Sequence, residues 1–192
     1  MEHLSREGSL IKDSELLSQA ASGDANAFEA FVLRHREAVW RFAHSLAQNP
    51  ASAEDALQDT FLSAWRSAAE FQGENSALGW LLTIARNAVY RQYRGRAGEP
   101  DRMESLAELG EAAGWGAEDD PLDAIVVQDE VGRALGRLSL EDREVLVLRE
   151  IEGFSIEECS TLLGLGCPAL KSRLHRARLR FTAHLRGERH GK

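Results

Sequence analysis

Apolar residues recur every three or four positions along most of the chain, and this spacing most constrains the fold. One such run contains Trp80, Leu81, Ile84, Ala85 and Ala88. This period places the apolar side chains on one side of a helix, whereas strand signals are absent from the sequence. The pattern therefore predicts an all-α protein.

The helical pattern is interrupted in the middle of the chain. Residues 97–130 hold 11 acidic residues and a single basic one, Arg102, together with several glycines and prolines. Like charges, glycine and proline disfavour a packed helix. We therefore predict two small helical domains, residues 10–95 and 122–186, joined by an acidic flexible linker at 96–121.

Composition excludes several classes of protein. The only two cysteines, Cys159 and Cys167, are too few for a disulfide scaffold and suggest a reducing compartment. Met1–Ser9 lacks the apolar core of a secretory signal, and no apolar run approaches the ~20 residues that span a bilayer. We expect a cytoplasmic protein without membrane insertion.

Motifs for catalysis, metals and cofactors are also missing from the sequence. Its six histidines show no metal-ligand spacing with the cysteines. It contains no nucleophile elbow, phosphate loop or dinucleotide fingerprint. We expect neither a metal nor a cofactor, and not an enzyme.

The distribution of charge changes what the net charge implies. The net charge of −8 taken alone argues against a nucleic-acid partner. However, residues 77–96 carry four arginines and no acid, and residues 166–192 carry eight basic residues and one acid. These two segments remain candidates for DNA contact, and the acidic linker could shield the C-terminal one in the free protein.

Residues typical of helix starts and ends divide the N-terminal domain into several predicted helices. We expect Asp13 to cap a helix ending near Gly23, Pro50 to end a longer one, and a capping-box variant at 52–55 to open a third. One face of that third helix carries a polar set with one leucine: Asp55, Gln58, Asp59, Leu62 and Arg66. Spacing alone favours a solvated face, although Leu62 slightly favours a protein partner.

A fourth helix is expected from about Ala77 to Arg94, with Ser76 as its cap. Its outer face combines side chains suited to phosphate contact, base-edge hydrogen bonding and base stacking: Arg86, Asn87, Tyr90, Arg91 and Arg94. Arginines near a helix C-terminus also complement the helix dipole. The residues alone leave these two interpretations about even.

The C-terminal domain has the pattern of a helix-turn-helix. A capping box at Ser155–Glu158 opens a short helix, 164–166 make a turn, and a basic amphipathic helix follows from Pro168. Opposite its apolar stripe lie Ser172, His175, Arg176 and Leu179, with Lys171 beside them and Arg173, Arg178 and Arg180 flanking. We expect this helix to read DNA in the major groove, and less plausibly to lie on a membrane.

Three segments resemble a known family. DALQDTFLSAWR (55–66) and FQGENSALGWLLTIARNAVYRQYR (71–94) are similar to sigma region 2, and residues 138–181 are similar to sigma region 4. Together, in this order, they resemble a sigma-70 family factor of the extracytoplasmic-function (ECF) group. The resemblance implies core RNA polymerase and promoter DNA as partners, and an anti-sigma factor as regulator.

The resemblance also implies roles for particular residues. Asp55, Gln58, Asp59, Leu62 and Arg66 would dock on core polymerase. The −10 element would be held by Phe71, Asn75, Ser76, Arg86, Asn87, Tyr90, Arg91 and Arg94. The −35 element would be read by Lys171, Ser172, Arg173, His175 and Arg176.

Some residues depart from the family pattern, and two other functions remain. Residues 166–170 read GCPAL where many members have a Val-Gly-Thr-Val type of segment, and Gln72 stands where arginine is frequent. Both departures bear on base preference. The alternatives are a polymerase-independent helix-turn-helix regulator, which leaves the faces around Asp55 and Arg86 unexplained, and a decoy that binds polymerase or an anti-sigma factor without DNA.

Overall fold

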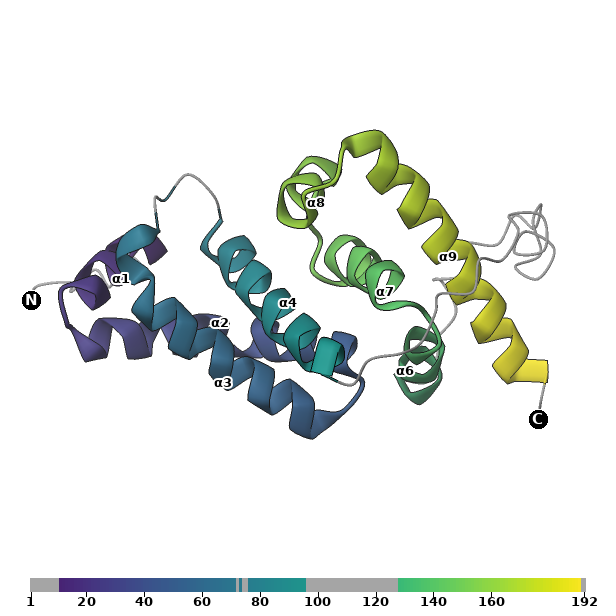
Figure 1. Ribbon diagram of the computed structural model, residues 1–192, viewed down its shortest axis with the longest axis horizontal. Helices are drawn as coiled ribbons and strands as arrows, with labels where there is room; N and C mark the ends of the chain where they lie inside the picture. Colours follow the sequence, from purple (N-terminus) through teal and green to yellow (C-terminus); the bar gives the residue numbers. More distant parts are fainter. Residues whose placement is uncertain (1–10, 72, 74–75, 96–127, 191–192) are drawn as a thin grey trace, which may run out of the picture.

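The computed structural model describes residues 11–71, 73, 76–95 and 128–190. Every regular element in these residues is a helix, so the all-α prediction is confirmed. The N-terminal half comprises α1 (Asp13–Ala21), α2 (Ala25–Ala47), α3 (Pro50–Arg66), the short 3-10 helix η1 (Ala68–Glu70) and α4 (Ala77–Gly95). The C-terminal half comprises α6 (Gln128–Gly136), α7 (Leu140–Leu146), the π-helical turn η2 (Val147–Ile151), α8 (Ile156–Leu163) and α9 (Cys167–His190) (Figure 1).

Helix α2 is the centre of the N-terminal half and contacts α1, α3 and α4. Its Phe31, Phe42 and Leu46 are fully buried, as is Leu81 of α4. Burying side chains of this size contributes about 1.5–3 kcal/mol each, which holds the four helices together.

Two of the predicted helix starts are wrong. Helix α1 begins at Asp13, but its cap position is Lys12 without a side-chain bond, because the Asp13 carboxylate pairs with Arg34 and His35 of α2. Helix α3 begins at Pro50 rather than near Ser52, and the Asn49 side chain accepts a hydrogen bond from the Ser52 amide at 3.2 Å. Proline at the first helical position costs no hydrogen bond, so Pro50 starts one helix instead of ending another.

The capping box predicted for the C-terminal half is confirmed. The Ser139 side chain caps α7, and Ser155 and Glu158 form a reciprocal capping box on α8. Gly164 ends α8 at φ +64°, in the left-handed region that favours glycine, so the chain turns sharply into α9. This is the predicted helix-turn-helix.

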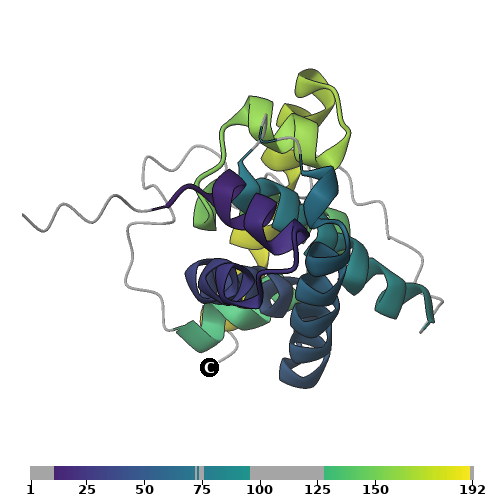
Figure 2. The ribbon, with the colours of Figure 1, turned by 90° about the vertical axis from the view of Figure 1, so that its left-hand side faces the viewer.

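The two halves pack against each other. Helix α4 contacts α8, and α2 contacts both α7 and η2. In Figure 1, α4 lies beside α7 and α8, whereas the end-on view in Figure 2 shows α3 well away from α8. Buried side chains of both halves form one contiguous hydrophobic cluster. The predicted linker at 96–121 lies outside the described residues.

None of the described helices combines the length and the apolar character needed to span a membrane.

Candidate nucleic-acid interface

The outer face of α3 is open to solvent. All five residues predicted there are exposed: Asp55, Gln58, Asp59, Leu62 and Arg66. Leu62 is 55% exposed and is the apolar member of this face. Asp59 also forms an ion pair with Arg91 of α4, with Arg91 Nη2 3.4 Å from Asp59 Oδ2. The face is therefore polar and open to solvent, with an exposed leucine among its charged side chains.

The loop before α4 places an aromatic side chain at its base. Phe71 is half-buried and its ring centroid lies 5.3 Å from that of Trp80. The Ser76 hydroxyl accepts a hydrogen bond from the Gly79 amide at 3.4 Å, in agreement with its expected capping role. Asn75 and Gln72 lie outside the described residues.

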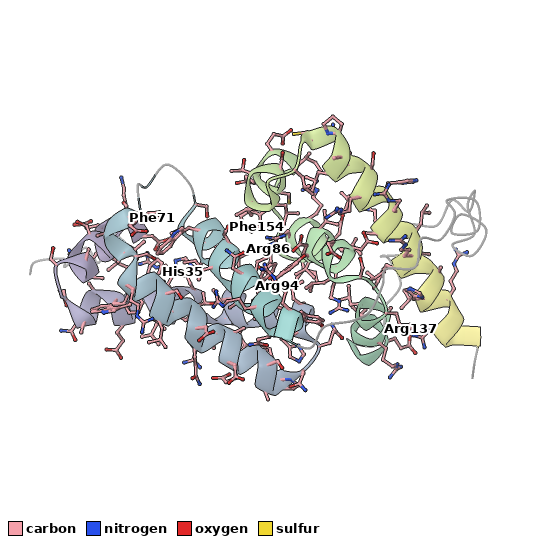
Figure 3. The ribbon with its side chains drawn as sticks, in the orientation of Figure 1. His35, Phe71, Arg86, Arg94, Arg137 and Phe154 are labelled. Carbon is pink, nitrogen blue, oxygen red and sulfur yellow. The ribbon has the colours of Figure 1, made fainter. Side chains whose placement is uncertain are left out.

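The basic face of α4 is divided in two by the C-terminal half. Asn87, Arg91 and Arg94 are exposed, but Arg86 and Tyr90 are half-buried. The Arg86 Nε lies 2.7 Å from Glu144 Oε2, its Nη2 lies 3.3 Å from Oε1, and its guanidinium carbon lies 4.5 Å from the centre of the Tyr90 ring. Figure 3 shows Arg86 between α4 and α7, and Arg94 belongs to the last turn of α4. The predicted five-residue face is therefore open at three positions and covered at two.

Burial controls the electrostatics of this contact. Burial raises the pKa of Glu144, against the hydrogen bond from Arg86, which lowers it. For Arg86, burial favours the neutral form, but the bond to Glu144 leaves its pKa raised. Burial and the Glu144 carboxylate raise the pKa of Tyr90 as well. The Arg86 guanidinium thus stays positively charged, and the Glu144 carboxylate from the C-terminal half balances this charge.

Arg143, next to Glu144, is the polar residue that sequence reasoning missed. Arg143 is 4% exposed, and its guanidinium donates to the carbonyls of Leu135 and Leu138 in its own half, at 2.8 and 2.9 Å. It also donates to the carbonyl of Leu46, near the end of α2, and to the Tyr93 hydroxyl at 3.4 Å. Arg143 therefore bonds the two halves together, and because its acceptors in the N-terminal half, the Leu46 carbonyl and the Tyr93 hydroxyl, are far away in sequence, no motif could have revealed it.

Helix α9 presents the predicted recognition residues. Lys171, Ser172 and His175 are exposed, and Arg173 and Arg176 are half-buried. Leu170, Leu174 and Ala177 form the apolar stripe of this helix and are buried. Leu179 is only 8% exposed, so its predicted place on the outer face is wrong.

Two flanking arginines of α9 are engaged by acids of their own half. Arg178 Nη2 lies 2.5 Å from Glu150 Oε1, and Arg180 pairs with the buried Asp142. The Arg180 side chain is 12% exposed, so it braces α9 against α7 rather than reaching a phosphate. Of the three flanking arginines, Arg173 remains the candidate phosphate contact.

The two cysteines are not paired. Cys159 is buried, which raises the pKa of its thiol to about 11, as expected for a structural side chain. Cys167 is half-buried at the start of α9. Among the residues that the structure describes, no group of three histidine, cysteine or acidic side chains is placed to hold a metal ion.

Two family models match the chain in the order expected from its helices. Residues 31–99 match Sigma-70 region 2, and residues 128–181 match Sigma-70 region 4. The chain belongs to the sigma-70 family. It is 35% identical over 180 residues to the RNA polymerase sigma factor CnrH of Cupriavidus metallidurans, which covers 90% of this chain and 94% of CnrH. It is 34% identical to the ECF RNA polymerase sigma factor SigM of Mycobacterium tuberculosis, over 88% of this chain and 83% of SigM.

Solved structures of sigma-70 family members share the fold. CnrH in complex with the cytosolic domain of CnrY superposes with a TM-score of 0.66 at 31% identity, covering 91% of this chain and 97% of CnrH. The sigma factor RpoE from Bartonella quintana, in complex with the anti-sigma factor NepR, gives 0.64 at 30% identity, covering 83% and 96%. The resemblance to ECF sigma factors found in the sequence is thereby confirmed.

Proposed function

We propose that this chain is an alternative sigma factor that binds core RNA polymerase and directs it to promoters with −35 and −10 elements. The observation that carries the proposal is the presence of region 2 and region 4 in one chain, in that order. A polymerase-independent regulator needs only the second of them. We infer domain bounds of 10–95 and 122–186, separated by the linker at 96–121.

Each of the three surfaces has one partner in this proposal. Core polymerase binds the open α3 face around Leu62, where charged side chains surround an exposed leucine. Phe71, Asn75, Ser76 and the basic face of α4 hold the −10 element. Lys171, Ser172, Arg173, His175 and Arg176 of α9 read the −35 element.

The mechanism requires binding energy and no catalytic group. Two small DNA contacts held on one large enzyme raise each other's effective concentration. Unstacking a base costs a few kcal/mol, which binding of the flipped base and the single strand offsets. The chain would therefore act in the cytoplasm as an initiation factor rather than an enzyme, without a cofactor, and under an anti-sigma factor such as the one bound to its relative RpoE.

The experiment is a transcription reaction with core polymerase, the purified chain and a DNA library randomised upstream of the start site. Sequencing the RNA should recover templates with two enriched blocks at one fixed separation. A single block bound equally well without polymerase would instead support the helix-turn-helix regulator. No enriched template, together with binding to polymerase, would support the decoy.

A further inference from the structure

A cavity lies between the start of α4 and helix α8. Its volume is about 570 Å³, within the range of about 300–1,000 Å³ that is typical of small-molecule pockets. One wall comes from η1, Ser76 and the first turns of α4, and the other comes from Phe154 and α8. The two walls are in close contact, since a Cβ atom built on Gly79 would lie 3.3 Å from the Leu162 side chain. The cavity is therefore a hollow between two packed helices.

Three aromatic side chains of the described residues line this cavity. Phe71 and Trp80 have ring centroids 5.3 Å apart, and their planes are inclined by 50°. Phe154 lines the cavity from the C-terminal half and is 7% exposed (Figure 3). The faces of aromatic rings carry partial negative charge and attract cations within about 6 Å. The lining thus suits a ligand with an apolar body and a positive charge.

Among the described residues, every charged side chain that lines the cavity is acidic. These side chains are Glu70, Glu157 and Glu158, and all three are exposed at the rim. Within the part of the chain that the structure describes, neither Glu70 nor Glu157 belongs to an ion pair. The Ser155 amide donates to Glu158 Oε2 at 2.7 Å, which lowers the pKa of Glu158 and keeps it charged. The rim is therefore negative and open to a counter-ion.

The charge of the walls decides which class of ligand fits. The wall segments, residues 70–83 and 154–162, contain four acidic residues and no lysine, arginine or histidine. An anion would be repelled here, although Phe71 and Ser76 also belong to the surface assigned above to the −10 element. A metal ion needs several converging ligands, and no group of three such side chains in the described residues is placed to hold one. An organic cation is the class that fits both the acids and the rings.

We propose that this cavity is a binding site for a small organic cation, an ammonium group carried on a flat apolar body. The body lies against Trp80 and the two phenylalanines, and the ammonium group donates hydrogen bonds to Glu70 or Glu157 at the rim. The inference concerns the cavity alone, so it goes beyond the proposed function and does not depend on it.

Titration of the full-length chain with 2-phenylethylammonium tests the proposal. The chain has four tryptophans, of which Trp80 lines the cavity, so the indole N–H signals of the ¹⁵N-labelled protein report where the probe binds. The Trp80 signal, identified with Trp80→Phe, should shift with a dissociation constant on the order of 1 mM, which is ordinary for so small a ligand. The signals of Trp40 and Trp65 should stay in place. Phenylpropionate, which has the same ring and the opposite charge, should leave all of them unchanged.

A pair of matched variants tests the role of the acidic rim. Glu70→Gln/Glu157→Gln removes two exposed carboxylates and keeps the size of both side chains, so folding is preserved. The control is Glu29→Gln/Glu54→Gln, which removes two exposed acids outside the cavity. The probe should bind about tenfold more weakly to the first variant and equally well to the second. Equal affinity of the two variants, or a wild-type Trp80 signal that does not move, would overturn the proposal.

A third variant fills the site from within the chain. Thr161 is exposed and lines the cavity, so Thr161→Arg supplies a tethered cation beside the acidic rim. The guanidinium should compete with the probe and abolish the shift of the Trp80 signal. A titration curve identical to that of the wild type would contradict the assigned site.

Failure of this inference is distinguishable from failure of the proposed function. A chain that supports transcription, but whose Trp80 signal does not respond to the probe, retains the sigma function and loses the cation site. A chain that binds the probe as described, but never supports transcription with core polymerase, retains the site and loses the sigma function.

Discussion

At the scale of single residues, α3 offers the clearest separation between stability and binding. Asp55 and Asp59 are exposed and contribute nothing to the hydrophobic core. The pair Asp59–Arg91 is also about half exposed on both sides, and such surface pairs stabilise a protein by at most about 1 kcal/mol. Changes here should therefore act on partners rather than on folding.

We expect the double variant Asp55→Ala/Asp59→Ala to bind core polymerase at least tenfold more weakly, because it removes two charges from the docking face. Surface plasmon resonance on immobilised polymerase measures this affinity. The matched control is Glu29→Ala/Glu54→Ala, which removes two exposed acids at positions outside the predicted docking set. Equal affinity of the two variants would disprove the assignment of the docking face.

A buried histidine should make the N-terminal half sensitive to acid. His35 is 8% exposed and its Nε2 lies 3.0 Å from Asp13 Oδ2. Burial lowers its pKa below the ordinary value of 6.5, although Asp13 opposes this effect. The unfolded chain then binds more protons around that pH, so the free energy of unfolding should fall as the pH drops from about 7.5 to 5.5.

His35→Gln removes the titrating ring and should flatten this part of the pH dependence. Urea unfolding at several pH values measures the pH dependence of the free energy of unfolding. An unchanged pH profile in His35→Gln would show that the acid sensitivity arises elsewhere.

The burial of the charged residues of α7 could not be predicted from the sequence. The segment Leu140–Leu146 contains Glu141, Asp142, Arg143 and Glu144 in succession, which is typical of an exposed first turn. Three of these four are buried because their partners, Arg180, the Leu46 carbonyl and Arg86, are distant in sequence. A run of charged residues predicts exposure to solvent. Only the tertiary structure shows that these side chains are buried and that distant polar partners offset the cost of burying them.

At the scale of elements, local rules predicted the start of α8 correctly, but not the caps of α1 and α3. In the capping box of α8, Ser155 Oγ accepts from the Glu158 amide at 3.1 Å and Glu158 Oε2 from the Ser155 amide at 2.7 Å. The start of α3 was predicted three residues too late, because a proline can either end one helix or occupy the first position of the next. The Asn49 side chain caps α3, so Pro50 is the first residue of that helix.

We expect Ser155→Ala to destabilise the C-terminal half by about 1 kcal/mol, because it leaves an amide of the first turn of α8 without its acceptor. Thermal unfolding followed by circular dichroism measures the loss. Thr161→Ala, an exposed change later in the same helix, should cost clearly less. Equal losses of stability in the two variants would mean that the Ser155 cap contributes nothing beyond the difference in helix propensity.

At the scale of the whole molecule, the sequence predicts two helical domains but not how they sit. Helical periodicity, caps and the turn at 164–166 depend on neighbours along the chain, and they were sufficient for the elements. The arrangement of the halves depends on side chains such as Glu144 and on backbone carbonyls, which carry no periodic signal. The open part of the candidate site was therefore predictable, and the covering of Arg86 and Tyr90 was not.

The net charge of −8 also has its meaning at this scale. The two candidate DNA-binding segments are basic, and most of the acid lies between them. An overall negative chain is repelled by DNA unless its basic faces are presented together. The acidity would thus limit DNA binding by the free chain.

Run-off transcription from a template enriched in the library experiment tests whether the chain directs promoter-specific initiation. A transcript should form only when core polymerase and the chain are both present. Inserting five base pairs between the two enriched blocks should abolish it, because half a helical turn moves one block to the opposite face of the DNA. A transcript that forms with polymerase alone, or that is unchanged by the insertion, would contradict the account.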